Sequence, residues 1–424
     1  MLAHPPFLHF QLPLAIEYIH RGSDGRIPPV DERLITQVLH HRRRVGCIRL
    51  NAPYSAMVFR ALDGEFPVLK YLCLKIPNGP CFNWQPPRTF RTPDLKRLLL
   101  DNVICPLQSL LSTPDRAKSL ATLSLTEIRE PDKFGPNDLL QLLSLTLNLE
   151  TLRIGFTLFS STPAAEVQMM GLPIRTHVKL EYLRRFLFNG TSAYLGALLP
   201  HISTPLLEKL QIYISNWKST SIPDILQVMK GSGNLRSDDA DLMFLDKGVF
   251  LRANLTDGIK WSDLSISLHG NDFTWQVQSA AQFFGIHRAC FISTRRLTIR
   301  YRPHTSSPQR HPGPDPAQWG RLLREFPNVN ALLVYDGLHG ELSRPIQTNL
   351  GESSTELFPS LRQLSIQTSG MYRDACVPFV NARKDGNYVS LVHVGKAPSA
   401  SDVVISCEAW EAPWLWGSFR LRLA

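Results

Sequence analysis

The side chains best able to do chemistry in this 424-residue chain are basic. Lys and Arg number 46 against 36 Asp and Glu, which gives a formal net charge of +10. The densest cluster is His40 to Arg44 (HHRRR). Such a cluster can bind nucleic-acid phosphates, or it can be the solvated C-terminal end of a helix, where cations are favourable without a ligand. It contains no aromatic side chains for stacking on bases.

Patterns of catalytic or metal-binding residues do not occur. The sequence has no G-x-S-x-G, H-E-x-x-H, P-loop or G-x-G-x-x-G motif. The acidic run Ser237 to Asp241 (SDDAD) lacks the glycine and the distal glutamate of a calcium-binding loop. We therefore expect a protein that is not an enzyme and has no cofactor or metal site.

The seven cysteines are odd in number, scattered, and without a C-x-x-C pair. We expect them to be buried free thiols. They are Cys47, Cys73, Cys81, Cys105, Cys290, Cys376 and Cys407. No apolar run approaches the roughly 18 residues of a membrane span, and the N-terminus does not resemble a signal peptide. These features predict an intracellular protein of the cytoplasm, the nucleus or both.

A nine-residue phrase recurs along the chain and must position the basic side chains. Its clearest copies are FPVLKYLCL from Phe66, TPDLKRLLL from Thr92, TPLLEKLQI from Thr204, FPNVNALLV from Phe326 and FPSLRQLSI from Phe358. From Val45 to Leu207 the L-x-x-L-x-L cores start 24 to 34 residues apart. Between about residues 215 and 325 the register is lost. Weak candidates there are Leu264, Ile266 and Leu268, and Leu297 with Ile299.

The phrase has the alternation of a β-strand. Positions are counted from the first residue of the L-x-x-L-x-L core. In an extended backbone the side chains at positions four and six share one face, and we expect them to be buried, with positions three, five and seven outside. Helical patterns separate the phrases, over Ser55–Leu62, Pro106–Ser112, Asn137–Leu147, Thr191–Leu199, Ile222–Lys230, Thr274–Phe284 and Asp315–Phe326.

Alternating strands and helices at this period predict an α/β leucine-rich-repeat solenoid. This is a curved array of parallel strands with helices on the convex side, here with irregular repeats. The alternative is an α/β domain with a doubly wound sheet. We expect residues 1–44 to form a strand and helix leading into the array, residues 45–383 the solenoid, and residues 384–424 a C-terminal strand with a Trp-rich cap or tail.

The outward positions of the phrases predict a ribbon of side chains on the concave face. This ribbon has a basic bias, which favours a protein partner with an acidic surface. The alternative is that exposed strand residues are polar only to keep the face soluble. The expected partner-binding residues are Arg49, Tyr71, Lys75, Arg97, Arg153, Arg185, Lys209 and Tyr213.

The repeat region also resembles a known family. In order, RVGCIRLNAPYSAMVFRALDGEFPVLKYLCLKI, TFRTPDLKRLLLDNVICP, LATLSLTEI, LLSLTLNLETLRIGF, TPLLEKLQI, FPSLRQLSI and PFVNAR are similar to fungal F-box proteins with degenerate leucine-rich repeats. The likeness covers about Pro13 to Arg383. It implies the substrate-recognition part of a cullin-RING ubiquitin ligase, in which an F-box module binds the adaptor and the repeats hold a protein substrate.

The first residues depart from that family. Residues 1–44 contain no recognisable F-box, which would open with an L-P-x-E-x-L type motif. They therefore give no support to adaptor binding, and the resemblance is confined to the repeats. The alternative function is a stand-alone leucine-rich-repeat scaffold, or a nucleic-acid-binding solenoid, without a role in ubiquitin ligation.

Overall fold

A computed structural model describes the chain in segments that fall into two compact units. The first unit comprises the described residues within Met1–Thr162 and Val178–Leu183, and the second those within Pro163–His177 and Arg184–Trp410. The domain boundaries expected at residues 44 and 383 stay predictions. The described residues are 13–20, 26–77, 81–106, 118–128, 135–157, 174, 176–215, 225–226, 236–256, 261–270, 272–302, 315–335, 338, 342, 357–367 and 390–394.

The main sheet of the first unit is parallel throughout. Its strands lie in the order β1 (Leu14–Ile19), β2 (Val45–Asn51), β3 (Tyr71–Lys75), β5 (Arg97–Asp101), β7 (Thr122–Ile128) and β8 (Thr151–Phe156). The helices of this unit are α1 (Pro29–Leu39), α2 (Ala56–Ala61) and α5 (Pro136–Leu145). Short strands β4 (Phe82–Asn83) and β6 (Val103–Ile104) pair beside the main sheet, and β9 is Val178–Lys179.

The predicted inward positions of the phrase are buried. In β3, Leu72 and Leu74 lie inside while Tyr71, Cys73 and Lys75 are half-buried on the other face. Strand pairing puts equivalent residues opposite one another, so that the leucines form continuous columns through the unit. The columns are Ile48, Leu72, Leu98, Leu123 and Leu152, and Leu50, Leu74, Leu100, Leu125 and Ile154.

The turn after β5 depends on an asparagine. Asn102 has a φ of 56°, in the left-handed region that asparagine tolerates better than most residues. It is buried, and its side-chain amide donates to the carbonyl of Ile76 in the preceding turn at 2.9 Å. Its backbone N–H donates to the carbonyl of Thr126 in the next strand at 2.9 Å. One residue therefore links the turn after β3, its own turn and strand β7.

The sheet of the second unit is parallel except at one strand. Its order is β10 (Arg185–Thr191), β12 (Lys209–Ser215), β15 (Trp261–His269), β14 (Gly248–Thr256), β13 (Arg236–Leu245), β16 (Arg296–Arg302), β17 (Ala331–Val334), β18 (Gln363–Gln367) and β19 (Ser390–Val394). Strand β14 is antiparallel to both of its neighbours. We call β13, β14 and β15 the meander.

The meander occupies the stretch where the phrase pattern was lost. The chain reverses direction twice in the meander, so its outer strands β13 and β15 run in the same direction. Strand β15 therefore pairs parallel with β12, and β13 pairs parallel with β16. The weak candidates Leu264, Ile266 and Leu268 lie opposite Leu210, Ile212 and Ile214 of β12. Leu297 and Ile299 lie in β16 and are buried. The apolar columns therefore continue across the meander, whose hairpin the phrase did not predict.

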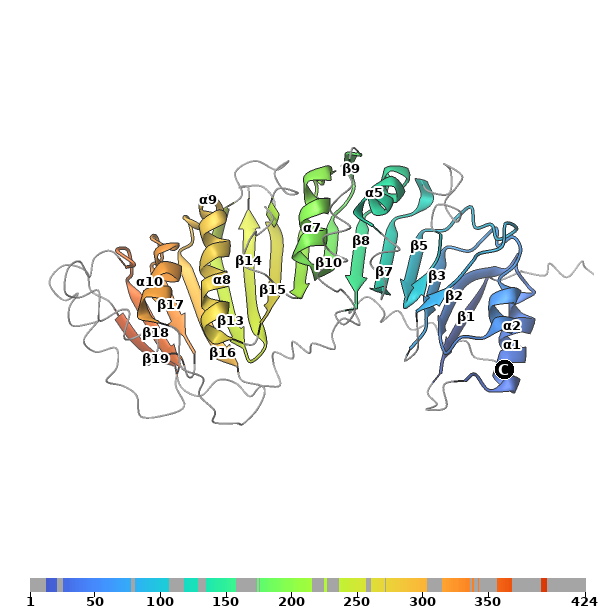
Figure 1. Cartoon of the computed structure of the whole chain (residues 1–424), viewed down its shortest axis with the longest axis horizontal. Helices are drawn as coiled ribbons and strands as arrows, with labels where there is room; N and C mark the ends of the chain where they lie inside the picture. Colours follow the sequence, from blue (N-terminus) through green and yellow to red (C-terminus); the bar gives the residue numbers. More distant parts are fainter. Residues whose placement is uncertain are drawn as a thin grey trace, which may run out of the picture. The chain divides into compact units, whose positions relative to one another are not determined.

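Helices of the second unit pack on one face of its sheet (Figure 1). They are α7 (Ser192–Leu198), α8 (Phe273–Ile286), α9 (Arg288–Phe291) and α10 (Pro316–Arg324), with a short 3-10 turn at Leu199–His201 before β11 (Ile202–Ser203). Phe244 of β13 packs edge-on against Phe273 and Trp319, with ring centroids 5.4 Å away in each case. Burial of these rings holds α8 and α10 to the strands.

The predicted helices are confirmed wherever the structure describes them. Asn137–Leu147, Thr191–Leu199, Thr274–Phe284 and Asp315–Phe326 correspond to α5, α7, α8 and α10. Ser55–Leu62 corresponds to α2, which Ser55 caps by accepting from the N–H of Val58. Those predicted at Pro106–Ser112 and Ile222–Lys230 lie largely outside the described residues, as do the prolines of 303–314 and the Trp-rich tail. The fold is an open, mixed α/β arrangement built on mostly parallel strands.

Replacing a leucine of the buried columns tests which positions of the phrase face inward. Leu98 is fully buried, so Leu98→Ala should lower the free energy of unfolding by about 2–5 kcal/mol. Its neighbour Arg97 is exposed, so Arg97→Ala should change it by no more than about 0.5 kcal/mol. Urea denaturation of the two variants measures both. Equal losses would show that the inward and outward positions are wrongly assigned.

Asn102 allows a matched test of backbone geometry. Asn102→Gly and Asn102→Ala both lose the hydrogen bond to Ile76, but only alanine is strained at a φ of 56°. We expect the alanine variant to be about 1 kcal/mol less stable than the glycine variant. Thermal unfolding of the pair measures the difference, and an alanine variant at least as stable as the glycine variant would contradict it.

Candidate functional site: the open strand face

The open face of each sheet is the face turned away from the buried leucine columns. In the first unit it carries five of the expected partner-binding residues: Arg49, Tyr71, Lys75, Arg97 and Arg153. Strand pairing places Tyr71 opposite Arg97, and the register row that begins at Arg49 ends at Arg153. The structure therefore brings these five side chains to one face of one sheet.

Two of these basic side chains are already paired with acids. Arg49 forms an ion pair with Glu17 of β1 at 2.7 Å, and the Lys75 ammonium lies 3.5 Å from the Asp101 carboxylate. Arg97 is exposed. Glu17 was missing from the predicted ribbon because the pattern did not place β1 in the array. The face is therefore less basic than the sequence indicated.

The three remaining expected residues lie on the second unit. Arg185 and Lys209 are neighbours in register on β10 and β12, and Tyr213 lies on the same face of β12. The Lys209 ammonium is 3.8 Å from a carboxylate oxygen of Asp263 on β15. Asp263 therefore offsets the charge of Lys209, and the phrase pattern did not predict that these two residues are neighbours.

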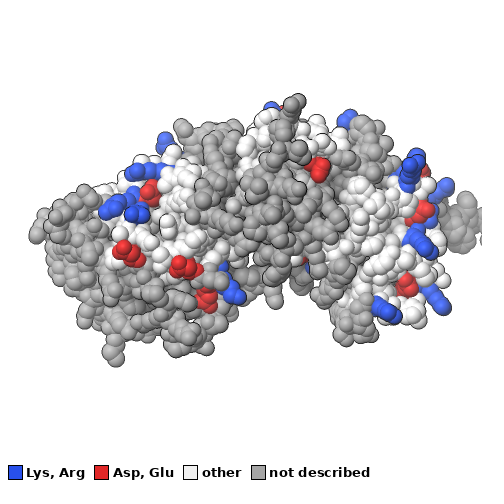
Figure 2. All heavy atoms as spheres, in the orientation of Figure 1, with Lys and Arg blue, Asp and Glu red and all other residues white. Residues whose placement is uncertain are grey.

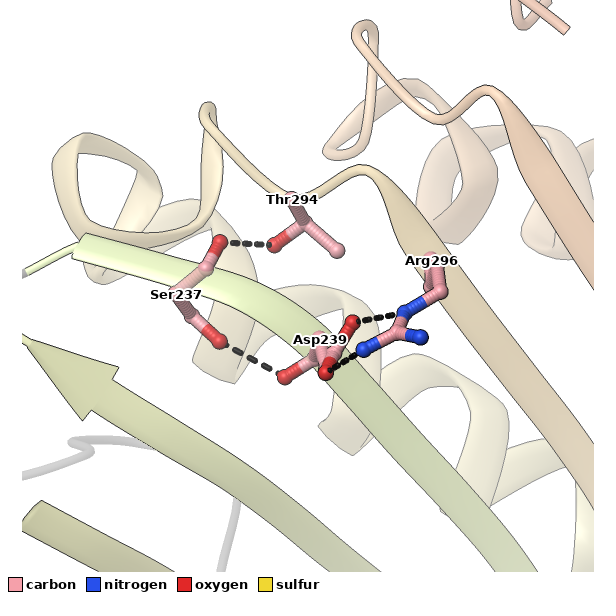
Figure 3. Close-up of polar contacts among 4 residues, drawn as sticks. All are labelled: Ser237, Asp239, Thr294 and Arg296. Atoms are coloured by element: carbon pink, nitrogen blue, oxygen red, sulfur yellow. Dashed lines mark hydrogen bonds and ion pairs between the residues drawn. The ribbon is translucent and has the colours of Figure 1, made fainter. Parts of the chain in front are cut away.

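The meander and the adjoining strand β16 add charged residues that the phrase pattern does not include. Arg296 of β16 donates from Nε and Nη2 to the two carboxylate oxygens of Asp239, with both distances 2.5 Å (Figure 3). Ser237 fixes the strand beside this pair: its hydroxyl donates to the carbonyl of Asp239 at 2.6 Å, and its own carbonyl accepts from the Thr294 hydroxyl at 3.0 Å. The pair is bidentate, which orients the guanidinium plane.

A second pair lies further along the same strands. Arg300 Nη2 is 3.3 Å from Asp241 Oδ2, and the guanidinium stacks over the ring of Tyr335 at 4.7 Å. Burial raises the pKa of Asp241, while Arg300 and Arg252 act in the opposite direction. Arg252 of β14 also lies 3.6 Å from Asp263. The open face of the meander is thus a network of alternating charges.

A signal for this network was present in the sequence. In SDDADLMF the acids Asp239 and Asp241 alternate with Ala240 and Leu242, which is the period of a half-buried strand. The run does not contain the L-x-x-L-x-L spacing, so the repeat pattern does not mark it as a strand. Asp246-Lys247-Gly248, with its glycine, is a hairpin turn signal between two such strands.

Most of the described cysteines are half-buried thiols, and Cys47 and Cys73 among them lie on the open face. Cys47, Cys73, Cys81 and Cys290 are partly exposed and Cys105 is buried, which corrects the expectation of burial for the first four. None of these five forms a disulfide. Cys376 and Cys407 lie outside the described residues. Burial raises the pKa of Cys73 to about 11, against the effect of Arg49. Burial likewise raises the pKa of the Tyr71 hydroxyl.

The basic cluster His40 to Arg44 directly follows α1, whose C-terminal cap is His40. This position favours the interpretation as a cationic helix end. Figure 2 shows the helix-bearing side, where Lys and Arg lie interspersed with Asp and Glu.

Other kinds of site find little support in the described part of the chain. No group of three or more His, Cys, Asp or Glu is placed there to hold a metal ion. None of the helices described is long and apolar enough to cross a membrane. A small cleft beside α1 and α2 is lined mainly by apolar side chains, among them Ile35, Leu50, Val58 and Phe59.

No model of a protein family matches this chain, and a search of curated proteins finds no match either. The resemblance to F-box proteins therefore remains a prediction from the sequence.

Cys73 gives a pH-dependent prediction. With a pKa of about 11, its thiol is protonated at neutral pH, so iodoacetamide should modify it slowly and faster as the pH rises. Its contribution to stability is fully present below the unfolded-state pKa of 9.0 and is lost as the pH rises through about 11. Peptide mass spectrometry of native and urea-unfolded protein measures the rates. Rapid modification of native protein at neutral pH would contradict the shift.

Proposed function

We propose that this protein is a binding module of the leucine-rich-repeat type, whose open strand face holds a protein partner. The observation that supports this most is the in-register stacking of successive strand phrases, with leucines on one side and half-buried polar side chains on the other. A stacked array presents a long, shallow surface, which suits a macromolecular partner better than a small substrate.

The proposal extends to substrate recognition in a cullin-RING ubiquitin ligase. Its basis is the order of the repeat phrases, which resembles that of fungal F-box proteins with degenerate leucine-rich repeats. In this role the open face would hold the substrate protein, and a separate module would bind the adaptor. A stand-alone scaffold is the alternative.

Nucleic-acid binding is the less favoured function. Phosphate binding depends on basic side chains whose charge is not already neutralised. Here Arg49, Lys75 and Lys209 each have an acidic neighbour within 4 Å, and Asp239 and Asp241 lie on the open face as well. Much of the basic charge of the predicted ribbon is therefore already paired, which leaves few free cations for a regular row of phosphates.

Affinity capture with a matched pair of variants tests the proposed face. Arg97→Glu reverses an exposed charge on the open face, whereas Arg91→Glu reverses one in the preceding loop, outside it. We expect capture from cell extract, followed by mass spectrometry, to recover a protein with wild type and Arg91→Glu and about tenfold less of it with Arg97→Glu.

The same capture separates the alternatives. Recovery of a cullin-RING adaptor together with the partner supports the ubiquitin-ligase role, and recovery of the partner alone supports a scaffold. Nucleic acid that is lost steeply with added salt would replace the proposal with the nucleic-acid function. A partner that both variants retain equally would show that this part of the open face does not bind it.

A further inference from the structure

We propose that the open face of the meander, together with the adjoining strand β16, docks an extended acidic segment of a partner protein, with acidic and bulky apolar residues two positions apart. This inference rests on the proposed function and specifies the chemistry of its partner. The surface consists of Arg252, Arg296, Arg300, Met243, Phe250 and Tyr335, together with the aspartates that orient the arginines.

The arginines form the outer layer of this surface. The side chains of Arg252 and Arg296 are 52% and 70% exposed, whereas those of Asp263 and Asp239, their ion-pair partners, are 29% and 37% exposed. The carboxylates thus lie deeper and hold the guanidinium groups above them. An approaching segment meets the cations first, which favours an anionic partner.

The guanidinium groups keep hydrogen-bond donors for such a partner. Arginine has five N–H donors, and Arg296 uses Nε and Nη2 on Asp239. Its Nη1 N–H groups are not used by this pair. Arg300 Nε and Asp241 Oδ1 are buried and have no hydrogen-bond partner in the described part of the chain. Because both atoms lack accessible surface, the donors open to a docked carboxylate are those of the exposed Arg296 side chain.

Two apolar residues lie in one register row, two residues from Arg252, and Arg300 of β16 ends that row. Met243 and Phe250 are paired in register on β13 and β14 and point to the open face, while Phe244 and Val249 next to them face the core. Met243 is itself covered, at 8% exposed, so Phe250 is the accessible member of the two. Phe250 is half-buried, and Tyr335 supports Arg300 from the side of β17. The surface can therefore bury a bulky side chain next to a carboxylate.

The spacing along the strands gives the sequence pattern of the partner. Met243 is two residues beyond Asp241, and Phe250 is two residues before Arg252, so the two rows are about 6.6–6.8 Å apart. In an extended peptide, residues two apart point to the same side at the same spacing. A segment aligned with the strands would present the order acidic, any residue, bulky apolar.

Three labelled peptides test this chemistry by fluorescence anisotropy with the full chain. The first repeats Glu-Ser-Phe-Ser, the second replaces Phe by Ala, and the third replaces Glu by Lys. We expect the first to bind, the second to bind about tenfold more weakly, and the third not to bind. Binding of the first peptide should weaken as salt is added.

Variants of the chain then locate the site. Arg252→Ser and Phe250→Ala should each weaken the first peptide about tenfold. Asp263 keeps Lys209 as an ion-pair neighbour in the first variant, which favours a folded protein. Arg288→Ser is the control, because Arg288 on α9 is similarly exposed and similarly paired, with Glu325 at 3.9 Å. Thermal unfolding of all three checks that they are folded.

Four outcomes would each overturn the inference. The first peptide does not bind; the Ala peptide binds as tightly as the first; the Lys peptide binds more tightly than the first; or Arg288→Ser weakens the first peptide as much as Arg252→Ser and Phe250→Ala do. The affinity capture with Arg97→Glu remains independent, because Arg97 lies in the first unit. A partner lost with that variant, but unaffected by Arg252→Ser and Phe250→Ala, would leave the proposed function standing without this docking surface.

Discussion

The structure depends on the alignment of apolar side chains between neighbouring parallel strands. Each phrase contributes two residues to the columns and could not bury them alone, because a single short unit gains too little from burial to offset the ordering of its backbone. Pairing in register turns these residues into continuous columns, such as Leu72, Leu98 and Leu123. The opposite side of every strand is left to polar side chains, which is the origin of the open face.

This constraint also governs the charges of the open face. Residues opposite one another in register are held within reach, so acids and bases on adjacent strands pair without any loop to position them. Glu17 with Arg49 and Asp239 with Arg296 are of this kind. Exposed pairs of this sort contribute little stability, but they fix where guanidinium groups point. The overall charge of +10 therefore says little about the local character of this face.

Much of the fold could be predicted from the sequence because its period is strong where the phrase is intact. The inward positions, the helices α2, α5, α7, α8 and α10, and the strands around the expected binding residues follow from alternation and spacing. The meander could not be found in this way, because β14 runs in the opposite direction and carries Leu251 and Val249 without the phrase. The acidic neighbours were missed for the same reason: Asp263 and Asp239 enter the open face only when strand order is known.

The reversed strand β14 sets a parity rule for this fold. Between β12 and β16 lie three strands, and because the reversed strand β14 lies between β15 and β13, the last of them again has the direction of β16. Removing the β13–β14 hairpin as a unit would leave β15 to meet β16 in the parallel sense, whereas removing β13 alone would place β14 antiparallel beside β16. An antiparallel insertion at this point therefore keeps the rest of the sheet parallel only when it is a whole hairpin.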